Sequence, residues 1–537
     1  MSLGADRGAG LREWGGLALL ALPTVLLGLD VTVLYLVLPS LAAALDPSAP
    51  QMLWVMDAYG FFVAGFLITM GTLGDRIGRR RLLMIGMSAF AAVSVFAAFA
   101  PSTELLILAR ALLGIAGATL MPSTLSLISN MFSDRGQRAV AIGVWVTMFA
   151  LGMALGPVVG GALVDVFWWG AAFLLAVPIA VVVLAGARSL LPEYSDPAAG
   201  RLDLVSVVLS LAAILPIVYA VKHTADRGSL AGAASFLLLG GVAGALFVRR
   251  QRRLAAPLMD VRLFSNRALS AALVVLLIGL VGVGGTMYLV TQYLQLVEGL
   301  SPFVAGLWMG PPALAMFAAA IGAPLIARRI RPGVVMAGTL TLSVIGYALL
   351  ATAGTADATR VVVGFAFVYL GLGAIAALGT EIVVGVAPAS QSGSAAAMSE
   401  TVQELGIAVG VAVLGSLTAA VYSMRMTVPA GVSPETANRV AESLSGALSF
   451  DAEVPDGVIR SAQEAFAVGV NAAAVVAGLA VVVATALCLS ALRQVRPLGD
   501  GQHGSPPVTG CSTTLEQRRE HELCSQDQRR RPQGSGR

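Results

Sequence analysis

Long apolar runs, separated by short polar turns or turns containing Gly and Pro, dominate the pattern along this chain. A helix that crosses a bilayer needs about 20 consecutive apolar residues, and the chain supplies about fourteen such runs. The shorter apolar-polar alternation that a membrane β-barrel requires is absent from the sequence. The pattern therefore predicts an all-α membrane protein with spans over 15–38, 52–74, 82–100, 105–130, 139–164, 168–188, 203–221, 231–248, 270–296, 303–327, 332–353, 360–386, 395–421 and 466–492.

Composition supports a membrane location for the chain. Of its 537 residues, 57% are hydrophobic and only 12% are charged, with a mean hydropathy of +0.84. That is too little polar surface to cover a water-soluble globule. No cleavable signal peptide is expected, because the first apolar run lacks a small-residue cleavage site and a second run follows at once. We expect a multi-pass protein of the inner membrane.

The positions of the arginines predict which face of the membrane each loop occupies. An even number of spans places both termini on one side, and short cytoplasmic loops carry an excess of Lys and Arg. The arginine-rich loops all fall on the side of the termini, which predicts that the termini are cytoplasmic. The arginines in these loops are Arg76, Arg79, Arg80, Arg81, Arg135, Arg138, Arg249, Arg250, Arg252, Arg253, Arg328, Arg329 and Arg331.

The order of the spans predicts two six-helix bundles joined through an inserted helix pair. The expected parts are a cytoplasmic N-terminus over 1–14, an N-terminal bundle over 15–196, inserted helices and a linker over 197–261, and a C-terminal bundle over 262–495. The last part includes a long outer loop over 422–465. Segment 496–537 is polar and has no apolar period, so we expect it to be disordered.

A glycine- and arginine-rich loop, GTLGDRIGRRR, follows the second span. Its glycines permit tight turns, while its acidic and basic side chains can pair with one another or with helix ends. A cluster that merely marks the cytoplasmic side is the plain alternative. The loop resembles the signature motif of the major facilitator superfamily. The resemblance implies a latch that holds the two halves outward-facing, formed by Gly71, Asp75, Arg76, Gly78, Arg79 and Arg80.

Two further segments resemble motifs of the same superfamily. Arg110 lies in LARALLGIAGA, and an arginine at membrane depth should face a polar interior and have a partner. The alternative is that Arg110 snorkels to the outer interface. The second segment, GMALGPVVGGA, offers a smooth face for close helix packing and a proline kink, which small-residue packing alone would also explain. It resembles a motif of proton-exchanging exporters, carried here by Gly152, Gly156, Pro157, Gly160 and Gly161.

Four carboxylates lie within the apolar runs: Asp30, Asp57, Glu400 and Glu404. A charged carboxylate at the bilayer centre costs about 2.5 to 3.5 kcal/mol, so each should have a role. Glu400 and Glu404 share one helical face and cannot both ionise cheaply, so one is expected to hold a proton that it can exchange for a cation. Three alternatives stay open: a hydrogen-bonded pair that closes a helix kink, a solvated Asp57 at the outer interface, and a purely polar substrate contact that includes Gln403.

The segment from Gln51 to Gly86, which opens with WVMDAY, resembles the quaternary ammonium and methyl viologen exporters of the fourteen-helix drug:proton antiporter family. The resemblance extends over the whole spanning region. It implies a monomer in membrane lipid that exchanges lipophilic organic cations for protons, driven by the proton gradient and without a cofactor. Some of those exporters carry an aspartate in the tenth helix that binds dications. Span 303–327 has no acidic residue, so handling of dications is an open question.

The sequence lacks the residue patterns that catalysis or metal binding would require. The chain has three histidines, no phosphate-binding glycine loop with an adjacent lysine, and no recognisable nucleophile and base pair. Cys488, Cys511 and Cys524 have no metal-ligand spacing. We expect no catalytic residue, no metal site and no nucleic-acid partner. A dedicated exporter of one natural product and a membrane sensor or enzyme are the rival hypotheses, and the sequence does not identify the substrate.

Overall fold

The computed structural model describes residues 10–132, 134–194, 203–225, 230–254, 261–386, 392–426, 434–449 and 456–497, and the regular structure of these residues is helical. The α-helices are α1 (Leu11–Leu45), α2 (Ala49–Ile77), α3 (Arg79–Ala98), α4 (Thr103–Met131), α5 (Arg135–Val166), α6 (Ala171–Leu174), α7 (Ala176–Leu190), α8 (Leu204–Ala225), α9 (Leu230–Gln251), α10 (Arg267–Gln292), α11 (Pro302–Trp308), α12 (Gly310–Ala327), α13 (Pro332–Leu350), α14 (Ala358–Val386), α15 (Ser392–Arg425), α16 (Pro434–Glu442), α17 (Leu444–Ser449) and α18 (Asp456–Ala491). A 3-10 helix, η1 (Val261–Ser265), precedes α10, and a π-helix, η2 (Tyr293–Val297), follows it.

Twelve helical segments among the described residues are long and apolar enough to cross a membrane. Two shorter apolar stretches, Gln51–Leu67 in α2 and Val205–Ile217 in α8, accompany them. The prediction of an all-α membrane fold is confirmed, while the number of fourteen spans stays a prediction. Two of the predicted spans contain a break, because Leu175 separates α6 from α7 and Met309 separates α11 from α12.

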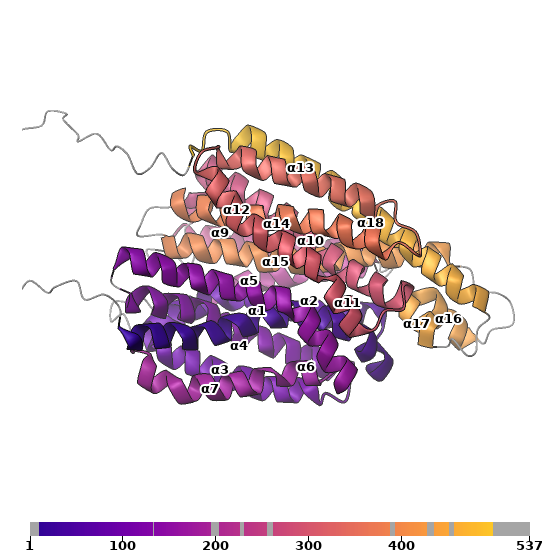
Figure 1. Ribbon diagram of the computed structural model, residues 1–537, viewed down its shortest axis with the longest axis horizontal. Coiled ribbons are helices and arrows are strands. Elements are labelled where there is room, and N and C mark those ends of the chain that lie inside the picture. The colour runs from indigo at the N-terminus through magenta and orange to yellow at the C-terminus, as the bar shows by residue number, and fades with distance from the viewer. Residues whose placement is uncertain are drawn as a thin grey trace, which may run out of the picture.

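The helices form two groups that lie side by side along the long axis of the molecule (Figure 1). In the first group, α1 packs on α5 and α4 packs on α2 and α3. In the second group, α10 packs on α14, α15 and α18, and α14 packs on α12 and α13. We call α1–α7 the N-half and α10–α18 the C-half. The exact domain bounds drawn from the sequence stay predictions.

The two ends of the molecule carry different elements. Helix α1 begins and α18 ends at the same end (Figure 1), where the Arg331 side chain donates to the Arg493 carbonyl at 3.3 Å. The opposite end carries α16 and α17 (Figure 1). We call the first the terminal end and the second the cap end. The predicted tail over 496–537 lies outside the described residues from 498 onward.

The stretch over 422–465, predicted to be a long outer loop, contains helical structure. Helix α15 continues to Arg425 and α18 begins at Asp456, so helical structure covers both margins of the predicted loop. Between them lie α16 and α17. The Tyr422 hydroxyl at the end of α15 donates to the Val440 carbonyl of α16 at 2.8 Å, which holds the short helix against the C-half. That the loop lies on the outer side of the membrane stays a prediction.

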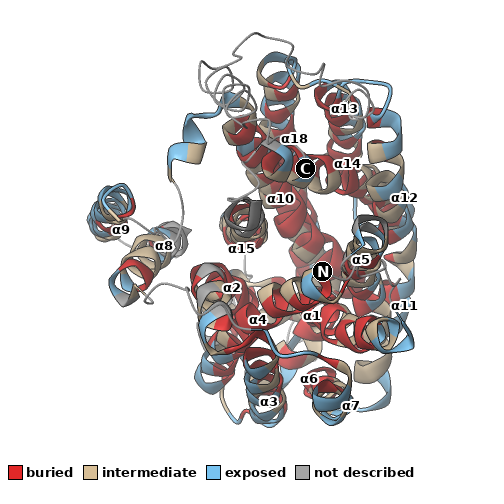
Figure 2. Cartoon of the chain, turned by 90° about the vertical axis from the view of Figure 1, so that its left-hand side faces the viewer, coloured by how far each residue is buried: buried red, intermediate tan, exposed pale blue. Residues whose placement is uncertain are grey.

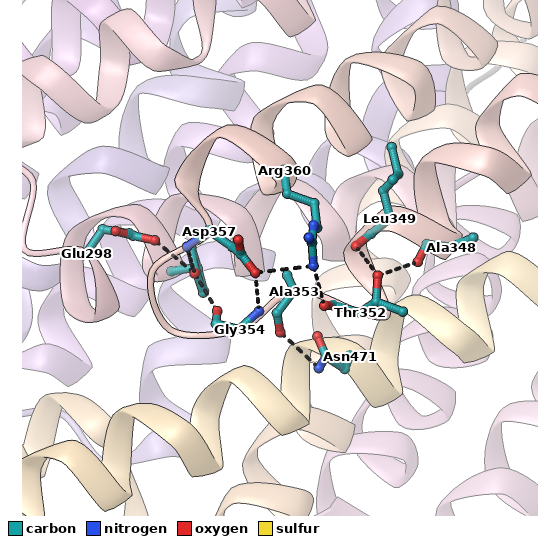
Figure 3. A network of polar contacts seen from close by, with 10 residues as sticks. Glu298, Ala348, Leu349, Thr352, Ala353, Gly354, Asp357, Arg360 and Asn471 are labelled. Carbon is teal, nitrogen blue, oxygen red and sulfur yellow. Dashed lines mark hydrogen bonds and ion pairs between the residues drawn. The ribbon is translucent and has the colours of Figure 1, made fainter.

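Helices α8 and α9 stand beside the two halves (Figure 2). They pack mainly on each other, and α8 also contacts α2 and α15. Arg250 binds Asp203 through two hydrogen bonds of 2.7 Å, and Gln251 donates to Ser206 at 2.7 Å. These bonds join the start of α8 to the end of α9.

Candidate functional site

Glycines of the predicted antiporter motif bring α1 and α5 into close contact. A side chain on Gly152 would overlap the backbone of α1, and one on Gly156 would overlap Thr32. The Thr32 hydroxyl uses this proximity, since it donates to the Met153 carbonyl at 3.0 Å and to Gly28 at 3.3 Å. The first part of the motif therefore acts inside the N-half, where close backbone approach is the known use of small residues.

The end of the same motif crosses to the other half. A Cβ atom on Gly161 would lie 2.6 Å from the carbonyl carbon of Pro302 in α11. In the reverse direction, a Cβ atom on Gly306 would lie 2.8 Å from the carbonyl carbon of Pro157. Gly160 lies against Val33 of α1. The α5 and α11 backbones thus touch at the cap end, and this contact closes the seam between the halves there.

Arg110 of α4 is buried in the N-half, with only 2% of its surface exposed. Its Nη1 atom lies 3.0 Å from Asp30 Oδ2, and its Nε donates to the Val55 carbonyl at 3.2 Å. Its Cζ atom stands 4.7 Å from the ring centre of Tyr59, within the range of a cation–π contact. The alternative that Arg110 snorkels to the interface is wrong, because three partners hold the guanidinium inside the protein.

A small cavity of about 20 Å³ lies where the two halves meet around Arg110. Asp57 of α2 and Glu404 of α15 line it from opposite halves, together with Tyr35 and Tyr59. Asp57 is 1% exposed, so the alternative of a solvated aspartate at the interface is also wrong. The structure therefore brings Asp57, Arg110 and Glu404 to one cavity, and Asp30 joins them through its ion pair.

Gly60 permits the close crossing of α2 and α15 beside this cavity. A Cβ atom there would lie 3.3 Å from the Ala408 side chain and 3.6 Å from the Glu404 carbonyl oxygen. Sequence reasoning missed Gly60, Tyr35 and Tyr59. A signal was present for two of them, since Tyr59 and Gly60 follow Asp57 directly in the same turn of helix.

Glu400 lies one helical turn from Glu404, toward the terminal end, and is half-buried outside the small cavity. Gln403 donates to the Ser399 hydroxyl at 3.4 Å. The two glutamates therefore share a helix face but not one compartment. Within the described residues, no group of three or more His, Cys, Asp and Glu side chains is placed to hold a metal ion.

The arginines of the predicted latch contact their own half. Arg80 pairs with Glu193 at 3.4 Å and donates to the Leu191 carbonyl at 3.0 Å, both just after α7. Arg79 donates through its side chain to the Pro122 carbonyl of α4 at 3.4 Å. Both of these arginine contacts therefore stabilise the N-half itself.

The other residues of the predicted latch have different surroundings in the structure. Gly78 has φ of +108°, a conformation that favours glycine, and a side chain there would overlap Glu193. Gly71 lies near Pro122, Arg76 is exposed, and the side chain of Asp75 lies outside the described residues. The predicted roles of the latch and coupling residues stay predictions.

Comparison with known sequences decides the family. Residues 20–411 match the profile described as Major Facilitator Superfamily. The chain belongs to that superfamily. It is 43% identical over 488 residues to the multidrug efflux pump LfrA of Mycolicibacterium smegmatis, covering 90% of this chain and 97% of that protein. It is 33% identical over 463 residues to the methyl viologen resistance protein SmvA of Salmonella typhimurium, covering 85% of this chain and 93% of that one.

Solved structures support the same fold. A bacterial homolog of the human lysosomal transporter Spinster superposes with a TM-score of 0.65 over 93% of this chain and 100% of that one. Their sequences are 18% identical, so this likeness concerns the fold alone. The chain is accordingly a multi-pass inner-membrane transporter of the efflux type, and not an enzyme.

Proposed function

We propose that this chain is a proton-coupled antiporter that exports lipophilic organic cations by alternating access. The observation that carries the proposal is the charge around the small central cavity. Three carboxylates, Asp30, Asp57 and Glu404, surround one guanidinium, that of Arg110. The three negative charges and one positive charge leave a formal surplus of two negative charges. Buried charge without compensation is costly, so protons or a bound cation must neutralise the surplus.

The position of Glu404 supports an exchange between these two occupants. It comes from the C-half, while Asp30, Asp57 and Arg110 come from the N-half. Movement of one half against the other therefore changes the surroundings of Glu404. A carboxylate that loses its cation as the halves separate can take a proton instead, which is the chemistry of antiport.

The proposal includes fourteen spans and a cytoplasmic terminal end. Helices α2 and α8 supply the two spans beyond the twelve long ones. Arginines such as Arg79, Arg80 and Arg250 gather at the ends of helices on the side of the termini, as the positive-inside tendency requires. With this orientation, the contact between α5 and α11 lies at the outer face of the membrane.

The relatives support organic cations as the substrate class. One is named a multidrug efflux pump, and methyl viologen, to which another gives resistance, is an organic cation. Methyl viologen carries two positive charges, whereas 303–327 contains no acidic residue, so the handling of dications stays an open question. Proton exchange, rather than ATP, is the proposed energy source.

The test uses an efflux-deficient host that contains the full chain and is loaded with tetraphenylphosphonium. Nigericin in potassium medium collapses the pH gradient while cellular ATP is measured in parallel. We expect efflux to stop while ATP stays constant, and Glu404→Gln to abolish the response to the gradient. Efflux that continues without the pH gradient would contradict proton exchange.

Binding measured against pH tests the exchange more directly. A cation that competes with protons for the carboxylates binds more tightly as pH rises, because deprotonation frees the site. We expect this slope in the wild type and its loss in the Glu400→Gln, Glu404→Gln double variant. An affinity that is independent of pH in the wild type would contradict the exchange even if the protein exports.

A further inference from the structure

A second cavity, of about 80 Å³, lies near the cap end and is separate from the central one. Its walls come from both halves and from the α16–α17 segment. Leu53 of α2 forms part of the N-half wall, and Tyr288, Gln292 and Tyr422 form part of the C-half wall. None of these residues belongs to the coupling site described above.

Gln292 is the unusual member of this lining. It is only 5% exposed, and its Oε1 atom accepts no hydrogen bond from any described residue. A buried polar atom without a partner costs free energy, so such groups in native proteins call for an explanation. Gln292 lines the cavity, but its Oε1 atom has almost no exposed surface in this state, so a ligand reaches that atom only once the cavity widens.

The backbone at this point is also irregular. Gln292 is the last residue of α10, and the π-helix η2 (Tyr293–Val297) follows directly. A π-helical turn is less favourable than an α-helical one and is frequently found at functional sites. Here it directly follows a residue that lines the cavity.

The rest of the lining suits an organic cation. Tyr288, Tyr422 and Phe466 contribute aromatic rings, and Glu442, at the end of α16, contributes an exposed carboxylate at the margin. Aromatic faces attract cations, and a carboxamide oxygen accepts an N–H donor of charged groups particularly well. The combination selects a flat cation that bears N–H groups, such as a protonated amine or an amidinium.

The size of the cavity indicates when such a cation could bind. A water molecule needs about 10 to 15 Å³ of this kind of space, whereas ligand pockets measure about 300 Å³ or more. The cavity in this closed state admits only small molecules. Its N-half and C-half walls meet at Leu53 and Gly415, where a Cβ atom on Gly415 would lie 2.9 Å from Leu53. Separation of the halves at the cap end would widen it.

We propose that this cavity is an exit-side subsite, which holds cations bearing N–H groups after they leave the central cavity and before release. Gln292 accepts the N–H group, and the three rings stack on the cation. The proposal rests on the proposed export of organic cations, but it adds a second binding position and a selectivity that the central carboxylates do not supply.

The experiment compares two cations and two matched variants in the full chain. Proflavine is flat and bears N–H donors, whereas tetraphenylphosphonium is a cation without any. Gln292→Met removes the carboxamide at nearly constant shape. Gln295→Met is the control, because Gln295 is similarly buried at 8% exposure and its Oε1 atom also lacks a partner among the described residues, but it does not line the cavity.

We expect Gln292→Met to lower proflavine efflux about fivefold, the ratio that one buried hydrogen bond contributes, and to leave tetraphenylphosphonium efflux unchanged. Gln295→Met should leave the efflux of proflavine and of tetraphenylphosphonium unchanged. Equal losses for both cations in Gln292→Met, or no loss for either, would overturn the subsite. Unchanged tetraphenylphosphonium efflux also shows that the proposed function is intact, so the two failures are distinguishable.

A second variant keeps the test decisive if Gln292→Met does not reach the membrane. Gln292→Asn retains a carboxamide but withdraws it from the cavity by one methylene group. We expect an intermediate loss of proflavine efflux with tetraphenylphosphonium efflux again unchanged. An Asn variant that transports both cations like the wild type would contradict a direct contact.

Discussion

The cap end and the terminal end of the molecule are held in different ways. At the cap end, Gly161 and Gly306 bring the backbones of α5 and α11 together across the two halves. At the terminal end, Arg79 and Arg80 bind groups of their own half. At the cap end, glycine contacts and the ion pair between Asp46 and Arg439 thus join the two halves, whereas Arg80 at the terminal end pairs with Glu193 inside the N-half. The difference teaches that a charged pair links the halves only where its two members come from opposite halves.

The largest effect on efflux is expected at the central cavity, which lies between the two ends. Asp30→Asn keeps an acceptor for Arg110 but removes the charge, and we expect efflux to fall on the order of a hundredfold, since a broken buried pair costs about 3 kcal/mol or more. Efflux of tetraphenylphosphonium, normalised to the amount of protein in the membrane, measures the effect. Wild-type transport would remove Asp30 from the mechanism.

A crosslinking measurement distinguishes this loss of efflux from a failure of the cap end to close. With the three native cysteines replaced, cysteines at Asp46 and Arg439 should be joined by a bifunctional thiol reagent when the cap end is closed, because the wild-type side chains form an ion pair there. We expect Asp30→Asn to retain this crosslink. Its disappearance would show that the central pair also controls closure.

The next largest effect concerns the backbone contact between α5 and α11 at the cap end. Gly161→Leu places a side chain against the α11 backbone, and overpacking of this kind costs about 1 to 3 kcal/mol. We expect the same cysteine pair to crosslink less and efflux to fall about tenfold, as about 1.4 kcal/mol implies. Gly143→Leu on the same helix is the control, since a Cβ atom there meets nothing within 4 Å. Equal losses in the two variants would contradict a specific role for the α5–α11 contact.

A smaller effect is expected at the terminal end. Gly78→Ala forces a side chain into a positive φ and against Glu193, and strain of this kind costs about 1 to 3 kcal/mol. We expect slower transport of every substrate by a similar factor, measured as initial efflux rates for several cations. Gly299→Ala, with φ of +68° and open space around it, supplies a control for strain alone. A changed order of substrates would argue against a purely conformational role.

The smallest effect is expected for the exposed ion pair between Asp46 and Arg439, which joins the N-half to α16. Exposed pairs contribute about 0.2 to 1 kcal/mol, so Arg439→Gln should change efflux by no more than about fivefold. The difference from the wild type should shrink at high salt because ions screen exposed charges. A large effect that is independent of salt would mean that α16 holds the cap end closed by itself.

The sequence predicted the helices of this molecule better than the contacts between them. Apolar runs located the spanning helices, and the cost of buried charge singled out Asp30 and Arg110 independently. Their pairing could not be predicted, because the two residues are separated by 80 positions and no local pattern links them. The same holds for Gly161 and Pro302, whose contact depends on how two halves meet.

Other features were missed because their local pattern is ordinary. Gln292 looks like one polar residue at the end of an apolar run, and only its surroundings show that its oxygen lacks a donor among the described residues. Helices α16 and α17 have 9 and 6 residues, too few to be found by a search for apolar runs of spanning length. The breaks at Leu175 and Met309 occur inside runs that remain apolar throughout, so hydropathy alone could not locate them.

The ion pair between Asp203 and Arg250 has a consequence for how the α8–α9 hairpin is held. It ties α8 and α9 into a hairpin that pairs its own charges and packs mainly on itself. Apolar side chains such as Leu238 and Val242 on α9 are largely exposed, as suits a surface in contact with lipid. The hairpin is therefore held together chiefly by its own two helices, and it meets the two halves mainly through α8.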